Sequence, residues 1–261
     1  MKRILRHVAS LFVVGLAAAA AVPACATNDQ TIFIRSALAP SINRQQGGCV
    51  YTADPTQNQL FEARADLGVT DSYFSVLLVG NQMIPRSDSL DNRAESNRVH
   101  INGAIVRVTE ADGTLIREFT SLATGFADPA STNTPSYATV GIVSLDAPTR
   151  DILLPQLPNR TVSKTILINI KAFGTSLGGK DVESGEFQLP ARVCNGCLIS
   201  FLNADDPLTQ GIDCNLSSSS AAGGGGGGGG SGSSQIPCFL GQDSSVSCTL
   251  CKDTNPRCRT L

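Results

Sequence analysis

The chain has no tryptophan, few other aromatic residues and only two histidines. An aromatic content of 5% means that a hydrophobic core has to be built from aliphatic side chains. His7 lies in the N-terminal segment, so His100 is the single imidazole in the remainder of the sequence. This excludes metal sites built from several histidines and leaves His100 as the one histidine base for a hydrolase, which would need a serine and a carboxylate such as Asp112 nearby. Nothing in the sequence predicts that these three groups come together in space, so we expect no enzyme activity, no cofactor and no metal.

The chain also lacks a basic stripe. After removal of residues 1–24, which are interpreted below as a signal, 17 basic residues stand against 22 acidic ones. Proteins that bind nucleic acid need clustered Lys and Arg side chains that displace counterions from phosphates. The acidic balance therefore excludes nucleic acid as an expected partner.

Long apolar runs are absent except near the N-terminus. Three basic residues precede an uncharged run over 7–21, and Val-Pro-Ala-Cys follows at 22–25. This order is typical of an export signal with its cleavage site. The run breaks at Pro23 and is shorter than the roughly 20 apolar residues that a permanent transmembrane helix needs. We expect residues 1–24 to be removed and the mature protein to be exported.

The end of this signal resembles the lipobox of bacterial lipoproteins, whose cysteine is acylated and becomes the new N-terminus. Val22, Ala24 and Cys25 match the lipobox pattern, and Pro23 departs from it. The resemblance implies a lipid anchor at Cys25, and Ala26 in place of an acidic residue implies sorting to the outer membrane. The alternative is cleavage after Ala26 at an A-x-A-like site, which would give a soluble secreted or periplasmic protein.

Eight cysteines remain once Cys25 is processed, and in an oxidising compartment an even number predicts disulfides. We expect four bonds, but eight cysteines allow 105 pairings, so the connectivity stays open. The eight are Cys49, Cys194, Cys197, Cys214, Cys238, Cys248, Cys251 and Cys258.

Two of these pairs, at 194–197 and 248–251, have C-x-x-C spacing. Zinc sites place two such pairs roughly 15 to 20 residues apart, and haem attachment needs a histidine directly after the pair; neither condition is met here. A redox pair of the thioredoxin kind lies at a helix N-terminus. Structural disulfides are therefore our interpretation, and an exported thiol–disulfide protein using a C-x-x-C pair is the alternative function.

The Asn-Gly dipeptide at 195–196 predicts a two-residue hairpin turn that joins 192–193 to the apolar run 198–202. Cysteines flanking such a turn could bond to each other only in a tight ring. We expect Cys194 and Cys197 to have separate partners, such as Cys49 or Cys214.

Alternation of apolar and polar residues predicts strands along most of the chain. A helix is expected at 149–154, capped by Asp146, begun near Pro148 and ended by Pro155. Strands without intervening amphipathic helices favour an all-β fold, an immunoglobulin-like β-sandwich, with a barrel of similar strand count as the alternative. The predicted strands are 31–37, 49–52, 73–79, 99–109 paired with 115–119 across an Asp-Gly turn, 137–145, 164–173 and 185–193.

The strand at 164–173 shows the alternation most clearly. We expect Ile166, Ile168 and Ile170 to face the core and the residues between them to face outward. Two long connections, 80–98 and 124–136, are either binding loops at one end of the sandwich or solvated excursions, and we favour the second interpretation.

Composition divides the chain into five segments. After the signal at 1–24, residues 25–30 form a tether, 31–216 the β-sandwich domain and 217–234 a low-complexity Gly/Ser linker with unbroken glycine at 223–230. Residues 235–261 form a cysteine-rich tail too small to build its own core, so its order has to come from disulfides or docking.

This layout of signal, lipobox, β domain, Cys-Asn-Gly-Cys and cysteine-dense tail resembles, in architecture only, uncharacterised cysteine-rich bacterial envelope lipoproteins. The resemblance implies a location in the cell envelope with attachment to the outer membrane through the N-terminal lipid, and it implies no particular activity. We expect a non-catalytic binding or structural role, with an envelope protein or a glycan as the partner.

Overall fold

The computed structural model describes residues 31–43, 48–86, 95–131, 134–200 and 238–247. Strands dominate these residues, which confirms the all-β prediction. The strands are β1 (Ile32–Leu38), β2 (Ser41–Asn43), β3 (Gly48–Val50), β4 (Gln59–Leu60), β5 (Ala63–Asp66), β6 (Tyr73–Asn81), β7 (Val99–Glu110), β8 (Leu115–Ala127), β9 (Ser136–Leu145), β10 (Ser163–Ser176), β11 (Asp181–Glu183), β12 (Phe187–Cys194), β13 (Ile199–Ser200) and β14 (Val246–Ser247).

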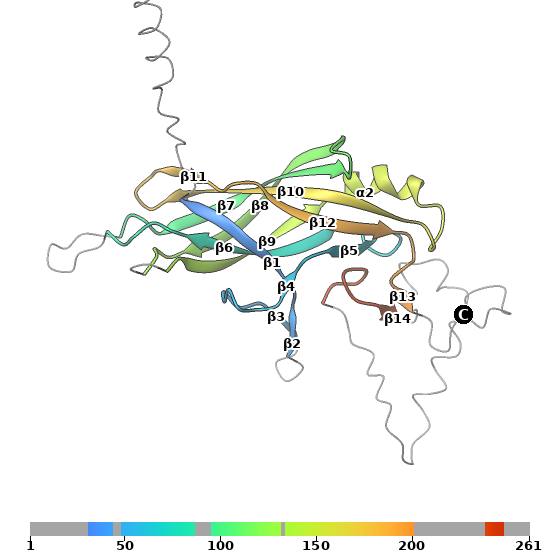
Figure 1. The fold of residues 1–261 in the computed structure, drawn as a ribbon, viewed down its shortest axis with the longest axis horizontal. Helices are drawn as coiled ribbons and strands as arrows, with labels where there is room; N and C mark the ends of the chain where they lie inside the picture. The colour runs from blue at the N-terminus through green and yellow to red at the C-terminus, as the bar shows by residue number, and fades with distance from the viewer. Residues whose placement is uncertain (1–30, 44–47, 87–94, 132–133, 201–237, 248–261) are drawn as a thin grey trace, which may run out of the picture.

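Two sheets pack face to face (Figure 1). The smaller has the order β4-β1-β6-β9, and the larger has the order β5-β12-β10-β7-β8 with β11 also on β10. Neighbouring strands in both sheets are antiparallel, apart from β5, which runs parallel to β12. The larger sheet curls at β8 until it meets β9, where the Val143 N–H donates to the Ser121 hydroxyl at 2.9 Å.

The core between the sheets is aliphatic, as the lack of tryptophan predicts. Ile166, Ile168 and Ile170 are all fully buried in it, which confirms the predicted inward face of β10. Asn169, expected to face outward, is only 5% exposed. Its position in the middle of the sheet explains this, because its amide donates to the Arg107 carbonyl of β7 and accepts from the Gln188 side chain of β12.

Local turn and cap signals are found where the sequence places them. Asp112 accepts a bond from the Thr114 N–H at 2.9 Å, and Gly113 adopts a φ of +90° in the turn between β7 and β8. Strand β8 extends to Ala127, so the first four residues of the predicted loop at 124–136 belong to this strand.

The helix α2 (Ala147–Leu153) begins at the predicted cap, since the Asp146 carboxylate accepts from the Thr149 N–H at 3.0 Å. It ends before Pro155, which lies in the following 3-10 turn η2 (Leu154–Gln156). Within the described ranges, no helix is both long and apolar enough to cross a bilayer.

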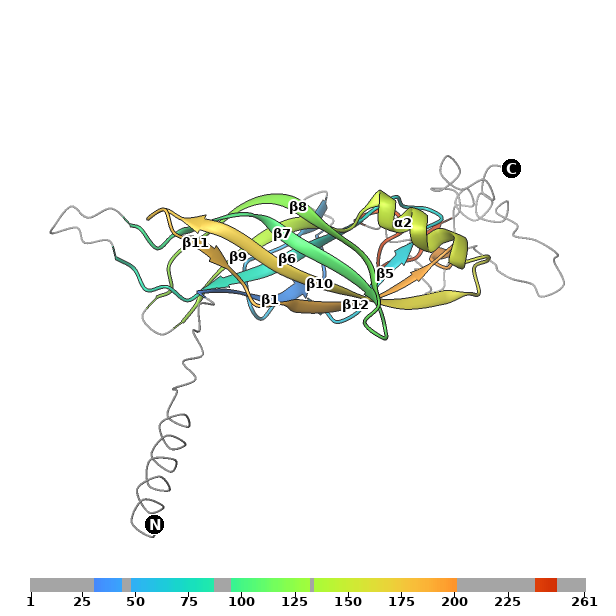
Figure 2. The same ribbon diagram turned by 90° about the horizontal axis from the view of Figure 1, so that it is seen from above.

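The two ends of the sandwich carry different features. At the two ends of β10, Ser163 pairs with Cys194 and Ser176 pairs with Val99. The 14 residues of this strand span about 45 Å. Helix α2 and strand β5 lie at the Cys194 end, whereas β11 lies at the other (Figure 2). Thr31 is also at the second end, where its carbonyl accepts from the Gln82 N–H.

Candidate functional site

Four of the cysteines predicted to form disulfides fall within the described residues, and they form two bonds. Cys49 bonds to Cys238 across 189 positions, and Cys194 bonds to Cys197. The expectation of separate partners for Cys194 and Cys197 is therefore wrong. The anchor Cys25 and the remaining Cys214, Cys248, Cys251 and Cys258 lie outside the described residues.

The predicted hairpin at Asn195–Gly196 is also wrong. Gly196 does adopt a left-handed conformation, with φ of +88°, and the chain turns there after β12. It does not return beside β12, because β13 pairs in parallel with β14 of the C-terminal segment. The turn brings the Cα atoms of Cys194 and Cys197 within 5.8 Å, a normal separation for bonded cysteines.

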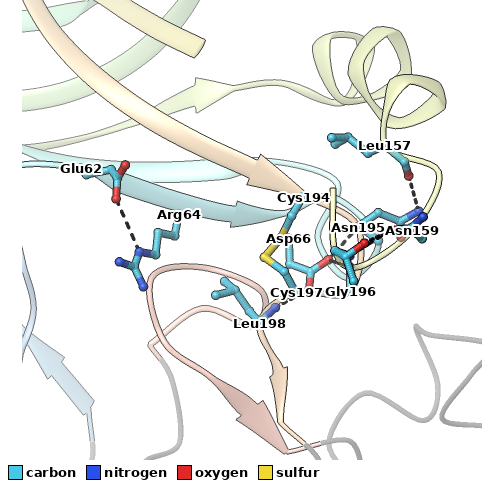
Figure 3. The surroundings of a disulfide bond; sticks show 12 residues. Glu62, Arg64, Asp66, Leu157, Asn159, Cys194, Asn195, Gly196, Cys197 and Leu198 are labelled. Atoms are coloured by element: carbon cyan, nitrogen blue, oxygen red, sulfur yellow. Dashed lines mark hydrogen bonds and ion pairs between the residues drawn. A yellow bond between two sulfur atoms is a disulfide. The ribbon is translucent and has the colours of Figure 1, made fainter. Parts of the chain in front are cut away.

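A buried carboxylate explains why the chain takes this path (Figure 3). Asp66 ends strand β5 and has no exposed surface. One of its oxygens accepts from the Gly196 N–H at 2.6 Å and the Gly68 N–H at 3.1 Å, and the other accepts from the Leu198 N–H at 3.0 Å. These bonds hold the backbone of the disulfide loop, and they compensate in part for burying the charge.

Burial raises the pKa of the Asp66 carboxyl above its ordinary value, although its three backbone hydrogen bonds and the charge of Arg160 act in the opposite direction. Desolvation is the largest of these influences, because the charged form loses its water. Asp66 is thus a carboxyl group for which proton uptake is easier than for an exposed one.

Neighbouring backbone fixes the remaining sides of the loop. The Leu67 N–H donates to the Cys194 carbonyl at 2.8 Å, and the Asn195 amide donates to the Leu157 carbonyl at 3.0 Å. Gly68 leaves room for the Asn195 side chain, since an added Cβ would lie 2.4 Å from the Asn195 side-chain oxygen and would force this side chain to move. The disulfide loop is therefore held between the turn after β5 and the end of η2.

The two cysteines differ in their exposure to solvent. Cys194 is fully buried, whereas Cys197 is solvent-accessible. The carboxylate of Asp66 and both sulfurs lie within 4.8 Å of one another. While the bond is intact neither sulfur is the thiolate that binds metals, so the chemistry that this group offers is thiol–disulfide exchange.

The C-terminal segment 238–247 docks beside this site through its backbone. The Asp66 N–H donates to the Gly241 carbonyl at 2.8 Å, and the Asp243 N–H donates to the Arg64 carbonyl at 2.9 Å. Cys238 fixes the start of the segment to the β2–β3 hairpin through Cys49. One residue, Asp66, therefore contacts the docked segment with its backbone and the disulfide loop with its side chain.

Side chains complete this docking. Gln242 is 6% exposed, and its amide accepts from the Phe74 N–H at 3.2 Å and donates to the Ser72 carbonyl at 2.8 Å. The Tyr73 hydroxyl donates to Asp243 at 2.7 Å. Burial, followed by the nearby Asp243 charge, raises the pKa of Tyr73 well above its ordinary value, so the phenol stays protonated as a donor.

His100 and Asp112 do not meet. His100 stacks on Phe126, with ring centroids 4.6 Å apart, and its Nε2 lies 3.2 Å from the Thr124 hydroxyl. Asp112 lies beyond the opposite end of β7, about 35 Å along the strand. The arrangement that a hydrolase based on these two residues would need is not formed.

The described parts of the long connection 80–98, which are 80–86 and 95–98, lie at the Thr31 end. These parts and the turn after β10 line a hollow of about 630 Å³ that includes Arg86, Asn97 and Lys180. The connection folds back on itself here, since the Arg86 N–H donates to the Glu95 carboxylate at 3.1 Å and the Asn97 amide donates to the Ile84 carbonyl at 2.7 Å. The hollow is thus built from backbone and short polar contacts, and no cluster of candidate catalytic residues from the sequence reaches it.

The sequence reasoning missed Asp66, Gln242 and Asp243. Asp66 is in a strand of only four residues with two buried alanines, and two of the three hydrogen-bond partners of its carboxylate are about 130 positions away. No local pattern marks such a residue. Neither a protein-family model nor a curated protein sequence matches this chain.

Proposed function

We propose that the protein is an exported lipoprotein of the bacterial cell envelope, attached through acylated Cys25 and serving a non-catalytic binding or structural role. The match of Val22, Ala24 and Cys25 to the lipobox carries this proposal. Residues 26–30 separate Cys25 from Thr31, and five residues span at most about 18 Å. An anchored molecule would keep its Thr31 end close to the bilayer.

The Cys194 end, with the docked segment 238–247, could then lie up to about 45 Å farther out. The two disulfides support export, because such bonds persist in oxidising compartments and are rare in the cytosol.

The same proposal includes an immunoglobulin-like fold. In that fold, strands A, B and E form one sheet, and strands C, F and G form the other, with C′ added beside C in some members. Taking β1, β6 and β9 as A, B and E leaves β8, β7, β10 and β12 as C′, C, F and G in their observed neighbour order. The strand order therefore supports the immunoglobulin-like arrangement over a closed barrel.

Mass spectrometry of the mature N-terminus tests the anchor. The full chain, expressed with its signal in a bacterial host that acylates lipoproteins, should begin at Cys25, carry the mass of the acyl groups and fractionate with membranes. Cys25→Ser should lose the acyl mass and the processing at this site. A mature chain that begins at Thr27 without acyl mass would contradict the proposal and indicate a soluble secreted protein.

A further inference from the structure

The Cys194–Cys197 bond is a reactive group for which the proposed function has no use. Cys194 is a fully buried residue, whereas Cys197 is solvent-accessible. As a purely structural crosslink this bond would add little to the stability of the fold. It closes a ring of only four residues, and the stabilisation from loop closure grows with the length of chain enclosed. Cys49–Cys238, in contrast, links positions 189 residues apart.

We propose that Cys194–Cys197 is an exchangeable disulfide that is attacked at Cys197 by a dithiol reductant of the envelope, and that Asp66 is the positioning residue that controls protonation of the Cys194 sulfur. This inference goes beyond the proposed function and does not depend on the lipid anchor.

The direction of attack follows from access. The attacking thiolate needs to approach the sulfur in line with the S–S bond, and only Cys197 is open to solvent. A bond forms between the reductant sulfur and Cys197 Sγ, and the Cys194–Cys197 bond breaks with its electron pair on Cys194 Sγ. The second thiolate of the reductant then attacks the reductant sulfur that is bonded to Cys197, and Cys197 is released. In total the reductant loses two electrons and becomes a disulfide, and the protein gains two electrons and two protons as a dithiol.

Asp66 matters because Cys194 leaves as a buried thiolate. A thiolate within 4.8 Å of a buried carboxylate is destabilised by both desolvation and like charge, so it takes up a proton. Arg160 is the charged group that attracts Asp66, and the remaining partners of the carboxylate are the backbone N–H groups of Gly68, Gly196 and Leu198. After reduction Cys194 is therefore held as a thiol, which is a poor nucleophile and closes the disulfide again only slowly.

The other disulfide provides an internal control. Cys49–Cys238 fastens a segment that is also held by Gln242 and Asp243, so reducing it removes a long-range crosslink from the folded protein. Incubating the purified full chain at stepwise increasing dithiothreitol, followed by alkylation and peptide mass spectrometry, measures both bonds together. We expect Cys194–Cys197 to open at a reductant concentration at least tenfold lower than Cys49–Cys238. Opening of both at one concentration, coincident with unfolding, would overturn the proposal.

Single-cysteine variants test which sulfur reacts. Cys194→Ser leaves Cys197 free, and Cys197→Ser leaves Cys194 free. With glutathione disulfide as the probe, we expect the first variant to form the mixed disulfide at least tenfold faster than the second, because Cys197 is a solvent-accessible residue and Cys194 is buried. Equal rates, or a faster Cys197→Ser variant, would refute attack at Cys197.

The role of Asp66 is tested by the pH dependence of alkylation of the buried thiol. In the reduced Cys197→Ser protein, adding Asp66→Asn removes a negative charge close to Cys194 and should lower the pH midpoint for iodoacetamide reaction by at least one unit. Asp243→Asn is the matched control, since this carboxyl is partly buried and bonds to Tyr73 and Arg64 instead of the loop. An unchanged midpoint in Asp66→Asn would remove Asp66 from the proposal, and the cysteine variants test the exchange even if this variant fails to fold.

Discussion

At the scale of single residues, the molecule depends on polar side chains buried at one end of its sandwich. Asp66 satisfies three backbone N–H groups that have no other partner among the bonds of the loop. A buried donor left unpaired costs about 1 to 3 kcal/mol. The carboxylate therefore maintains the loop although its own desolvation is unfavourable.

Burial of Asp66 gives the stability of the protein a particular pH dependence. Because its pKa is raised in the folded state, the folded protein holds its proton more tightly than the unfolded chain does. The contribution of this group is fully present below the ordinary carboxyl pKa and is lost as the pH rises through the raised value. We expect wild type to gain stability relative to Asp66→Asn as the pH falls from 7 toward 4, measured by urea unfolding at each pH.

Asp112→Asn is the control for this measurement. Hydrogen bonds from Thr114 lower the pKa of the exposed Asp112 carboxyl, so its contribution is present at neutral pH and is lost on acidification. Wild type should therefore lose stability relative to Asp112→Asn over the same range. Parallel pH profiles for wild type and Asp66→Asn would show that Asp66 titrates as it does in the unfolded chain.

Single residues also show where sequence patterns succeed. The isoleucines of β10 are predicted to face the core because alternation along a strand is a local property. The bond between Cys194 and Cys197 is not predicted by the sequence, since the turn between them is shaped by Asp66, about 130 positions earlier. The Asn-Gly pair correctly predicts a positive φ at Gly196, but several kinds of turn contain this conformation. The carboxylate of Asp66 decides which of these turns forms.

At the scale of elements, the least expected feature is the docking of 238–247 against the sandwich. The β7–β8 hairpin and α2 follow from their own turn and cap residues. Strands β5 and β14, with four and two residues, carry no periodicity that could be recognised. Strand β5 pairs with β12 and β14 pairs with β13, and the segment that carries β14 is held by the Cys49–Cys238 bond and by the side chain of Gln242.

Removing the Gln242 side chain should weaken this docking selectively. Gln242→Ala leaves the Phe74 N–H and the Ser72 carbonyl without their partner, which predicts a loss of about 2 kcal/mol in unfolding free energy. Hydrogen exchange should show faster exchange at the Phe74 amide. Ser245→Ala, at an exposed position of the same segment, should leave both measurements unchanged. An unaltered Phe74 amide in Gln242→Ala would mean that the disulfide alone holds the segment.

At the scale of the whole molecule, one aliphatic core joins the two sheets, and the polar sites lie at the ends. This division explains how much the sequence could predict. The core follows from alternation along long strands, and these strands are predicted to within a few residues, except that β8 continues eight residues beyond the predicted end at 119. The disulfide site combines β5, η2, the end of β12 and the docked segment, so it exists only once the sheets have formed.

The core also sets the stability of the whole fold, and β10 offers a direct test. Ile168 is fully buried between β7 and β12, so Ile168→Asp would place an unpaired charge in the aliphatic core. Such burial costs several kcal/mol, comparable with the roughly 5 to 15 kcal/mol that holds a typical domain together. We expect this variant to be unfolded by circular dichroism and by its urea transition at 25 °C.

Thr165→Asp is the matched control, because Thr165 is exposed on the opposite face of β10 and pairs across the strand with Arg192. A carboxylate there remains in water opposite a positive charge, so its unfolding free energy should stay within about 0.5 kcal/mol of wild type. The two substitutions differ only in the face of the strand that receives the charge. If Ile168→Asp were as stable as Thr165→Asp, the face of β10 that carries Ile168 could not be part of a packed core, and the two-sheet arrangement would be refuted.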